Sequence, residues 1–334
     1  MEKVFVIGAS SFLGLHCVNE LIKSKYYVKS STRSLKNKKK ITDNINNIDC
    51  IDKKLEICHL DLNLDSGWNE NLEGCDYLIH IPSPNSLKYN NEESLVKDIV
   101  DQIERSIINS ISAKIKKLIL ISSQATMSYG EDKKEYNEKS WTDDTNKNLN
   151  LYIKSRTKAE KIIWEKMNSS YKNKIDFCTL NSGFIIGPVL DRSSNSPSVN
   201  KIKDLLSYKI PILPERYINC IDVRDLAKLC IAALKCKKIN GIRFPCMQKN
   251  PISFYDLCKI LKNNGFNVTT LMLPNYMLTL FGKLNNRMRQ VRYLAKKKYI
   301  IDNSITIDLL DWKQTPVEKS IVDMANSLII NKKS

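Results

Sequence analysis

Residues 3–14, KVFVIGASSFLG, decide the fold of this chain. The apolar run Val4–Ile7 has the length of a buried strand, and Gly8 closes it. The stretch that follows, FLGLHCVNELIKS, places apolar side chains at the spacing of an amphipathic helix. A strand, a glycine turn and a helix in this order predict the opening unit of a parallel α/β sheet.

The rest of the chain repeats this alternation of strand and helix. Helical stretches over residues 94–112 and 155–167 separate several of the later strands. The pattern predicts an α/β protein with a doubly wound parallel sheet, the Rossmann fold. Further strands are expected in YYVKSSTR (26–33), LEICHLDL (55–62), DYLIHIPS (76–83), KKLILISS (116–123) and IDFCTLNSGFIIG (175–187).

The character of the sequence changes after Ile186, where GPVLDRSSNSPSVNK is rich in Gly, Pro and Ser. We expect residues 1–186 to form the Rossmann domain, completed by residues from about 215 to 237. A smaller substrate lobe with C-terminal helices is expected from residues 187–214 and 238–334. It includes a basic amphipathic helix over Leu273–Tyr293, which should pack its apolar stripe inward.

The composition of the 334 residues excludes several classes of protein. No stretch approaches the roughly 20 apolar residues of a membrane helix, and the N-terminus does not read as a secretory signal. The ten cysteines are scattered without a C-x-x-C pair, and there are only three histidines. We therefore expect neither a metal site nor a disulfide framework, and a reducing compartment, the cytoplasm.

The chain has 53 Lys and Arg against 36 Asp and Glu, which gives a net charge of +17. Such a charge indicates either an anionic binding partner or only a surface rich in basic residues. The basic residues are not interleaved with aromatic ones in a nucleic-acid-binding motif, so neither nucleic acid nor a membrane is expected to bind. A small part of the charge suits an anionic cofactor, and the rest is interpreted as surface bias. It favours an anionic small-molecule substrate, for a monomer or a homodimer.

The turn after the first strand has the features of a phosphate-binding loop. Gly8, Ser11 and Gly14 follow one another at three-residue spacing. Such a turn aims backbone N–H groups and a helix N-terminus at a pyrophosphate, although the same residues also suit an ordinary βα turn. Ser11 stands where a middle Gly is usual and tolerates fewer backbone angles.

The end of the second strand predicts which dinucleotide binds. Sites selective for NAD place an Asp or Glu there to hold the ribose hydroxyls. This chain has no carboxylate in SSTRSLKNKKK but has Arg33 directly after the strand. A guanidinium pairs well with a 2′-phosphate, so we expect NADP(H). A Lys cluster, Lys36, Lys38, Lys39 and Lys40, adds positive charge.

A Ser, a Tyr and a cation predict a site for carbonyl chemistry. Ser122 and Ser123 end a strand, at the edge where open α/β sheets bind ligands. Tyr152 and Arg156 share a helix face because they are four residues apart. A Tyr can donate a proton, a Ser can hold a carbonyl oxygen, and a nearby cation lowers the pKa of the Tyr.

Together these motifs resemble the extended short-chain dehydrogenase/reductase family, in its dihydroflavonol-4-reductase-like branch of the epimerase/dehydratase superfamily. VIGASSFLG resembles the family's G-x-x-G-x-x-G loop, and YIKSRTKAE resembles Y-x-x-S-K-x-x-A-E. HLDL, GCDYLIHIPSP, ISSQAT, YNEKSWTDD and CIDVRDLAK resemble further family segments, so the resemblance spans nearly the whole chain.

The resemblance implies an NADP(H)-dependent oxidoreductase that reduces a ketone or aldehyde to an alcohol by hydride transfer. Tyr152 would be the general acid, Ser123 would polarise the carbonyl oxygen, with Ser122 as the alternative, and Arg156 would hold the nicotinamide ribose and stabilise tyrosinate. The implied cofactor-binding residues are Gly8, Ser10, Ser11, Phe12, Leu13, Gly14, Arg33, Lys40, Asp61, Leu62, Ile81, Pro82, Tyr152, Arg156 and Asn181.

Three departures from the family pattern keep other functions open. Arg156 replaces the motif Lys and does not give up a proton, Ser11 replaces a Gly, and Ser182 stands where a Pro is frequent. One alternative is a catalytically weakened NADP(H)-binding sensor or scaffold. Another is a nucleotide-sugar epimerase or dehydratase, although Gln124 and Ala125, after the motif Ser, offer no acid.

Overall fold

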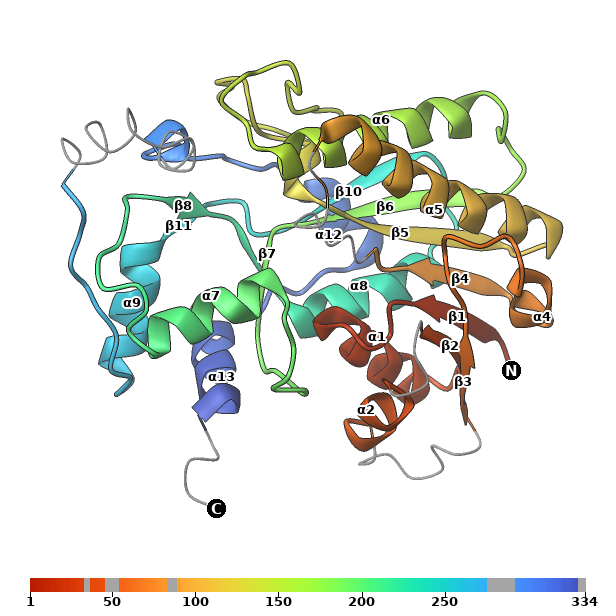
Figure 1. Ribbon diagram of the computed structural model, residues 1–334, viewed down its shortest axis with the longest axis horizontal. Coiled ribbons are helices and arrows are strands. Elements are labelled where there is room, and N and C mark those ends of the chain that lie inside the picture. The colour runs from red at the N-terminus through yellow and green to blue at the C-terminus, as the bar shows by residue number, and fades with distance from the viewer. Residues whose placement is uncertain (33–36, 46–53, 83–88, 90, 275–291, 330–334) are drawn as a thin grey trace.

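The computed structural model describes residues 1–32, 37–45, 54–82, 89, 91–274 and 292–329. Its centre is a seven-stranded parallel sheet in the order β10-β6-β5-β4-β1-β2-β3 (Figure 1). The order reverses between β1 and β4, which is the switch point of a doubly wound Rossmann fold, so the predicted fold class is confirmed. The strands are β1 (Lys3–Ile7), β2 (Tyr27–Thr32), β3 (Leu55–His59), β4 (Tyr77–His80), β5 (Lys117–Ser123), β6 (Asp176–Ser182) and β10 (Ile242–Cys246).

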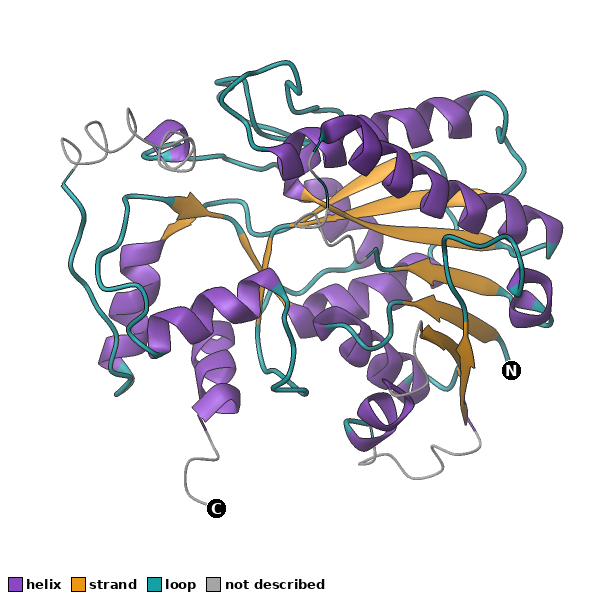
Figure 2. Ribbon diagram, in the orientation of Figure 1, coloured by secondary structure: helices purple, strands orange, loops and turns teal. Residues whose placement is uncertain are grey.

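Helices cover both faces of this sheet (Figure 2). Alternate residues of β1 point to opposite faces, because the side-chain period of a strand is two. Val4 and Val6 join the core under α1 (Phe12–Lys23) and α8 (Val223–Lys235). Phe5 and Ile7 join the core on the other face, under α4 (Trp68–Leu72), α5 (Glu92–Ser112) and α6 (Leu151–Asn168).

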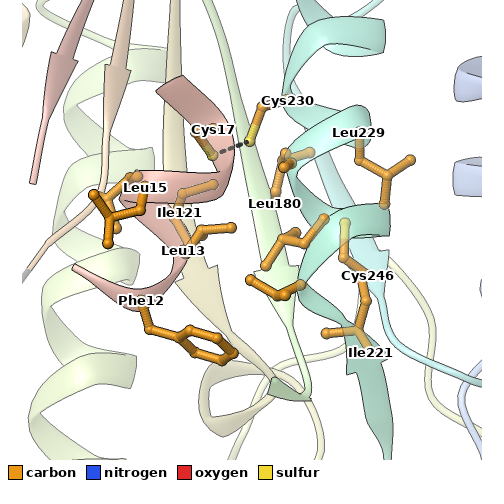
Figure 3. Close-up of a cluster of buried hydrophobic side chains, with 14 of the residues drawn as sticks. Phe12, Leu13, Leu15, Cys17, Ile121, Leu180, Ile221, Leu229, Cys230 and Cys246 are labelled. Atoms are coloured by element: carbon orange, nitrogen blue, oxygen red, sulfur yellow. Dashed lines mark hydrogen bonds between the residues drawn. The ribbon is translucent and has the colours of Figure 1, made fainter. Parts of the chain in front are cut away.

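The contact between α1 and α8 closes one face of the sheet (Figure 3). Cys17 of α1 faces Cys230 of α8 with 3.8 Å between their sulfur atoms. Both are buried free thiols that act as small apolar side chains. Among the described residues no group of three or more His, Cys, Asp or Glu could hold a metal ion.

Several of the remaining elements lie beyond the carboxyl ends of the central strands (Figure 1). Two small two-stranded sheets lie there, in which β7 (Phe184–Ile186) pairs with β9 (Cys220–Asp222) and β8 (Tyr217–Ile218) pairs with β11 (Ile252–Ser253). None of the described helices combines the length and the apolar character that a membrane span requires. The other helices are α2 (Asn37–Asp43), η2 (Gln124–Thr126), α7 (Pro197–Leu206), α9 (Phe254–Asn263), α12 (Ser304–Leu310) and α13 (Val317–Ile329).

Strand β10 extends the sheet further along the chain than expected. It lies within the range 238–334 that was assigned to the substrate lobe, yet it pairs in parallel with β6 as the edge strand. The short sequence IRFPC is a weak strand signal, because Pro245 has no N–H and is tolerated only at an edge. The rest of the proposed division into domains stays a prediction, and most of the helix expected over Leu273–Tyr293 lies outside the described residues.

Candidate active site

The turn between β1 and α1 is shaped by two glycines. Gly8 has a φ of +84°, and a Cβ added to it would lie 2.4 Å from the carbonyl oxygen of Ile81 in the chain after β4. A Cβ on Gly14 would lie 2.2 Å from the carbonyl oxygen of Gly8. Both positions therefore require glycine. The turn brings the N-terminus of α1 to the switch point of the sheet, where such folds bind dinucleotide phosphates.

Ser11, the departure from the middle Gly, fits this turn without strain. Its φ of −79° and ψ of 167° are an ordinary extended conformation that needs no glycine. Its hydroxyl oxygen accepts a hydrogen bond from the N–H of Gly14 at 3.0 Å and so caps α1. Ser10 is half-buried beside it, and Phe12 and Leu13 are buried in the first turn of α1.

The residues expected around the adenosine half of a cofactor follow β2 and β3 in the chain. Lys40, in α2, pairs with Asp191 at 2.5 Å. Although burial by itself would raise it, the pKa of Asp191 is lowered by Lys40 and by hydrogen bonds from Ser193. Asp61 and Leu62 follow β3, where both side chains are half-buried. Arg33 lies outside the described residues.

The chain after β4 lies directly beside the glycine turn. The N–H of Ile81 donates to the carbonyl oxygen of Ile7 at 3.1 Å, so β1 and β4 stay paired up to the switch point. Ile81 is buried, and Pro82 is half-buried next to it. Gly8 and Ile81 therefore lie side by side, and Pro82 is the next residue in the chain.

The two serines at the end of β5 have different environments. The hydroxyl of Ser122 is buried and donates to the carboxylate of Glu160 in α6. Ser123 is half-buried, and its hydroxyl oxygen accepts from the N–H of Ala125 at 3.1 Å. That bond uses a lone pair of Ser123 and leaves its O–H hydrogen available to a ligand.

Tyr152 lies in the first turn of α6, against the turn that follows Ser123. Ile153 packs with Ala125 in a small apolar cluster, and the hydroxyl of Thr157 donates to the carbonyl oxygen of Ala125 at 3.2 Å. These contacts hold the start of α6 against η2. The side chain of Tyr152 is 39% exposed at this edge of the sheet.

Arg156 follows one turn later, and its guanidinium is buried. The residue is 8% exposed, and its Nη1 has no hydrogen-bond partner among the described residues. Burial lowers the pKa of His80, at the end of β4, to about 3, and the nearby Arg156 charge acts in the same direction. A buried guanidinium with an unpaired donor is costly for a structure without a ligand. Its position over the end of β4 suits a hydroxyl-bearing ligand such as a ribose.

Glu160, one further turn along α6, is the centre of a buried polar network. Its carboxylate accepts from Nε of Arg243 at 2.7 Å and from the amide of Asn181 at 3.1 Å. Burial by itself would raise the pKa of Glu160, but the Arg243 charge and the hydrogen bonds from Ser122 and Arg243 lower it overall. Asn181 is fully buried, and its amide is held by Glu160, Thr126 and Thr179.

The structure thus brings Gly8, Ile81, Ser123, Tyr152 and Arg156 to one edge of the sheet. Asn181 lies beneath this edge, inside the Glu160 network. Reasoning from the sequence did not assign Glu160 or Arg243 to the site. One signal was present for Arg243, a charged residue within the otherwise apolar stretch Ile242–Cys246.

The comparison with models of known protein families identifies the family of this chain. The model of the 3-beta hydroxysteroid dehydrogenase/isomerase family matches residues 5–274. The chain belongs to this family. The match begins in β1 and extends past α9, so it includes the glycine turn, the Ser123 turn and α6.

The curated proteins that are similar to this chain include plant reductases. Dihydroflavonol 4-reductase of Solanum lycopersicum is 28% identical over 305 residues, which cover 88% of this chain and 76% of that protein. Cinnamoyl-CoA reductase CAD2 of Medicago truncatula is 24% identical over 270 residues, covering 78% of this chain and 79% of that protein. The resemblance found in the sequence is thereby confirmed.

Solved structures share the fold of this family member over nearly its full length. The yeast methylglyoxal/isovaleraldehyde reductase Gre2, solved in complex with NADPH, superposes with a TM-score of 0.78 at 22% identity and 98% coverage of both chains. Vestitone reductase from alfalfa (Medicago sativa L.) gives a TM-score of 0.76, also at 22% identity and 98% coverage of both chains.

Proposed function

We propose that the protein is an NADPH-dependent carbonyl reductase. The observation that carries the proposal is the buried guanidinium of Arg156, which has an unpaired Nη1 on the same helix face as Tyr152. A ligand that filled the site would pair this donor and offset the cost of its burial. Relatives whose names are those of reductases, and a structural neighbour solved with NADPH, support the same assignment.

The residues present fit a dinucleotide phosphate. The tight glycine turn between β1 and α1 and the N-terminus of α1 suit the pyrophosphate. We assign Arg33 and Lys40 to the 2′-phosphate, and Asp61 and Leu62 to the adenine side. The other contacts proposed for the cofactor are Ser10, Ser11, Phe12, Leu13, Gly14, Ile81, Pro82, Tyr152 and Arg156.

The bound cofactor supplies a hydride to the carbonyl carbon of the substrate. The hydroxyl of Tyr152 donates the proton to the carbonyl oxygen, so that hydride and proton together convert the carbonyl into an alcohol. The free O–H of Ser123 holds the same oxygen by a hydrogen bond. Arg156 pairs with the ribose hydroxyls and stabilises the tyrosinate that remains on Tyr152.

The substrate side of the site carries a cation, which supports an anionic substrate. The guanidinium of Arg216 lies against the hydroxyl of Tyr129, and Tyr129 lies within electrostatic range of Tyr152. We expect carbonyl compounds that carry a carboxylate to have a lower KM than their methyl esters, and Arg216→Gln to remove this difference.

Cofactor binding and turnover test the proposal separately. NADPH and NADP are expected to raise the melting temperature, and NADH and NAD to do so far less, since a ligand that binds the native state stabilises it by mass action. NADPH oxidation is then followed with a panel of aldehydes and ketones. Tyr152→Phe should remove turnover while NADPH binding remains. The control is Tyr27→Phe, at an exposed tyrosine on the opposite end of the sheet, which should change neither turnover nor NADPH binding. A wild-type protein that binds NADPH but oxidises it with no carbonyl would refute the reductase assignment.

A non-catalytic NADP(H)-binding sensor is the second candidate, because Arg156 stands at the motif Lys. An Arg retains the charge and the donors but does not give up a proton. The variant Arg156→Lys discriminates between the two. Activity that appears only in this variant would identify a lapsed enzyme, whereas activity that falls from a measurable wild-type value would identify an adapted one.

A further inference from the structure

Arg243, in the edge strand β10, has a permanently charged side chain that is buried in the protein. Its side chain is only 7% exposed. Such burial is tolerated only if the donors of the guanidinium are paired. Nε donates to Glu160 at 2.7 Å, Nη1 to the carbonyl oxygens of Ser140 at 2.6 Å and Glu138 at 3.2 Å, and Nη2 to both oxygens of Thr126 at 3.1 and 3.2 Å. The five N–H groups therefore have five acceptors.

These acceptors belong to three separate parts of the chain. Glu160 is in α6, Thr126 ends η2, and residues 138–140 precede Trp141. The guanidinium also stacks over the ring of Trp141 at 3.6 Å from its centroid. The Arg243 side chain thus connects α6, the turn after β5 and the segment before Trp141 to the edge strand β10.

Two of these connections lead to residues assigned to the reaction. The hydroxyl of Thr126, which accepts from Arg243, itself donates to the carbonyl oxygen of Ser123 at 2.9 Å. Glu160 lies on the same face of α6 as Arg156 and Tyr152, because the three residues are spaced by four. Arg243 therefore joins the turn that carries Ser123 to the helix that carries Tyr152.

We infer that Arg243 is a positioning residue that fixes the separation between Ser123 and Tyr152. The inference rests on the proposed function, because it concerns the two groups that would act on the carbonyl oxygen. Arg243 itself lies behind these groups and touches neither hydroxyl. Reacting groups must be held within about 0.5 Å of their productive geometry, and a displacement of about 1 Å costs roughly 100-fold in rate.

Two variants and two matched controls test this inference. Arg243→Lys keeps the charge but loses the planar fork of donors, and Thr126→Val removes the hydroxyl link to Ser123. Arg224→Lys alters another ion-paired arginine, bound to Asp222 and Asp323. Thr306→Val removes another buried hydroxyl that donates to a backbone carbonyl, that of Pro245 at 2.9 Å. Turnover, the Kd for NADPH and the isotope effect of deuterium at the transferred position of NADPH are measured for all four.

We expect kcat to fall about 10- to 100-fold in Arg243→Lys and Thr126→Val, with the Kd for NADPH within threefold of wild type. The deuterium isotope effect should rise, because hydride transfer becomes slower than the other steps. Both control variants should retain the wild-type kcat and isotope effect. An unchanged kcat in folded Arg243→Lys and Thr126→Val, or a loss of kcat matched by the controls, would overturn the inference and leave the proposed function standing. A wild-type enzyme that reduces no carbonyl would overturn both.

Discussion

The ammonium of Lys40 lies 2.5 Å from a carboxylate oxygen of Asp191. This ion pair joins α2, beside the expected adenosine site, to the loop that follows β7. Lys40 is also a residue assigned to the 2′-phosphate of NADPH. Asp191 and a 2′-phosphate would therefore compete for one cation, and the carboxylate would repel the phosphate.

Releasing Lys40 from this pair should strengthen NADPH binding selectively. We expect Asp191→Asn to lower the Kd for NADPH several-fold and to leave the Kd for NADH unchanged. Lys40→Met should raise the Kd for NADPH about 10-fold, the effect of one lost charge-assisted hydrogen bond. Lys39→Met, at the exposed neighbouring position, is the control. Fluorescence titration measures the affinities of wild type and the three variants for NADPH and for NADH, and equal changes for the two cofactors would remove Lys40 from the 2′-phosphate site.

The close approach of Gly8 to Ile81 predicts a substitution that damages both folding and cofactor binding. Gly8→Ala forces a Cβ to 2.4 Å from a backbone oxygen at a φ of +84°. Gly74→Ala is the matched control, because its φ of +68° is also positive but no atom lies within 4 Å of the added Cβ. We expect the control to cost about 1 kcal/mol of unfolding free energy and to retain NADPH binding. Gly8→Ala should cost more and abolish binding. Urea denaturation measures the unfolding free energies, and titration measures NADPH binding. Equal losses in Gly8→Ala and Gly74→Ala would mean that the backbone near Gly8 moves to accommodate the added Cβ.

Arg156 should contribute to function at the expense of stability. Its buried Nη1 has no described partner, so Arg156→Met removes an unpaired donor of a charged group from the interior. We expect the cofactor-free variant to gain about 1–3 kcal/mol of unfolding free energy. The melting shift caused by NADPH should shrink at the same time. A cofactor-free variant less stable than wild type would show that the guanidinium is satisfied within the protein.

The main sheet could be predicted because each strand is encoded locally. Val4–Ile7 followed by Gly8 needs no distant residue to specify a strand and a turn. Strand β10 was missed because IRFPC is short and contains Pro245, so its place beside β6 depends on tertiary pairing. Ser11 tolerates fewer backbone angles than the Gly that is usual at its position, and the angles it adopts are ordinary ones, which residue type alone does not specify.

The residues of the site divide in the same way. Tyr152 and Arg156 were found together because a helix brings residues four apart to one face. The Glu160–Arg243 pair joins residues 83 positions apart, and no local pattern places β10 beside α6. Asn181 was expected among the residues that contact the cofactor, but it lies within β6. Its full burial depends on Thr126 and Glu160, which reach it from other elements.

The charge of Glu160 should make stability depend on pH in the acid range. The pKa of Glu160 is lowered in the folded state, so its stabilising effect is complete above the pKa of the unfolded chain, about 4.3. This effect is lost as the pH falls through the lower folded value. The stability difference between wild type and Glu160→Gln should be constant from about pH 7 to 5 and shrink at lower pH. Chemical denaturation across this range measures it, and a constant difference down to about pH 3 would exclude a titrating Glu160.

A double-mutant cycle should show that Glu160 and Arg243 depend on each other. Either single change, Glu160→Gln or Arg243→Met, leaves a buried partner uncompensated and should cost about 3–5 kcal/mol of unfolding free energy. The double variant has no buried charge left without its partner. Its loss of unfolding free energy should therefore be smaller than the sum of the two single losses by about 0.5–3 kcal/mol. Arg224→Met with Glu160→Gln supplies the control cycle, because Arg224 pairs with Asp222 and Asp323. Additive costs in the Arg243 cycle, like those expected in the control cycle, would mean that the two charges are compensated independently.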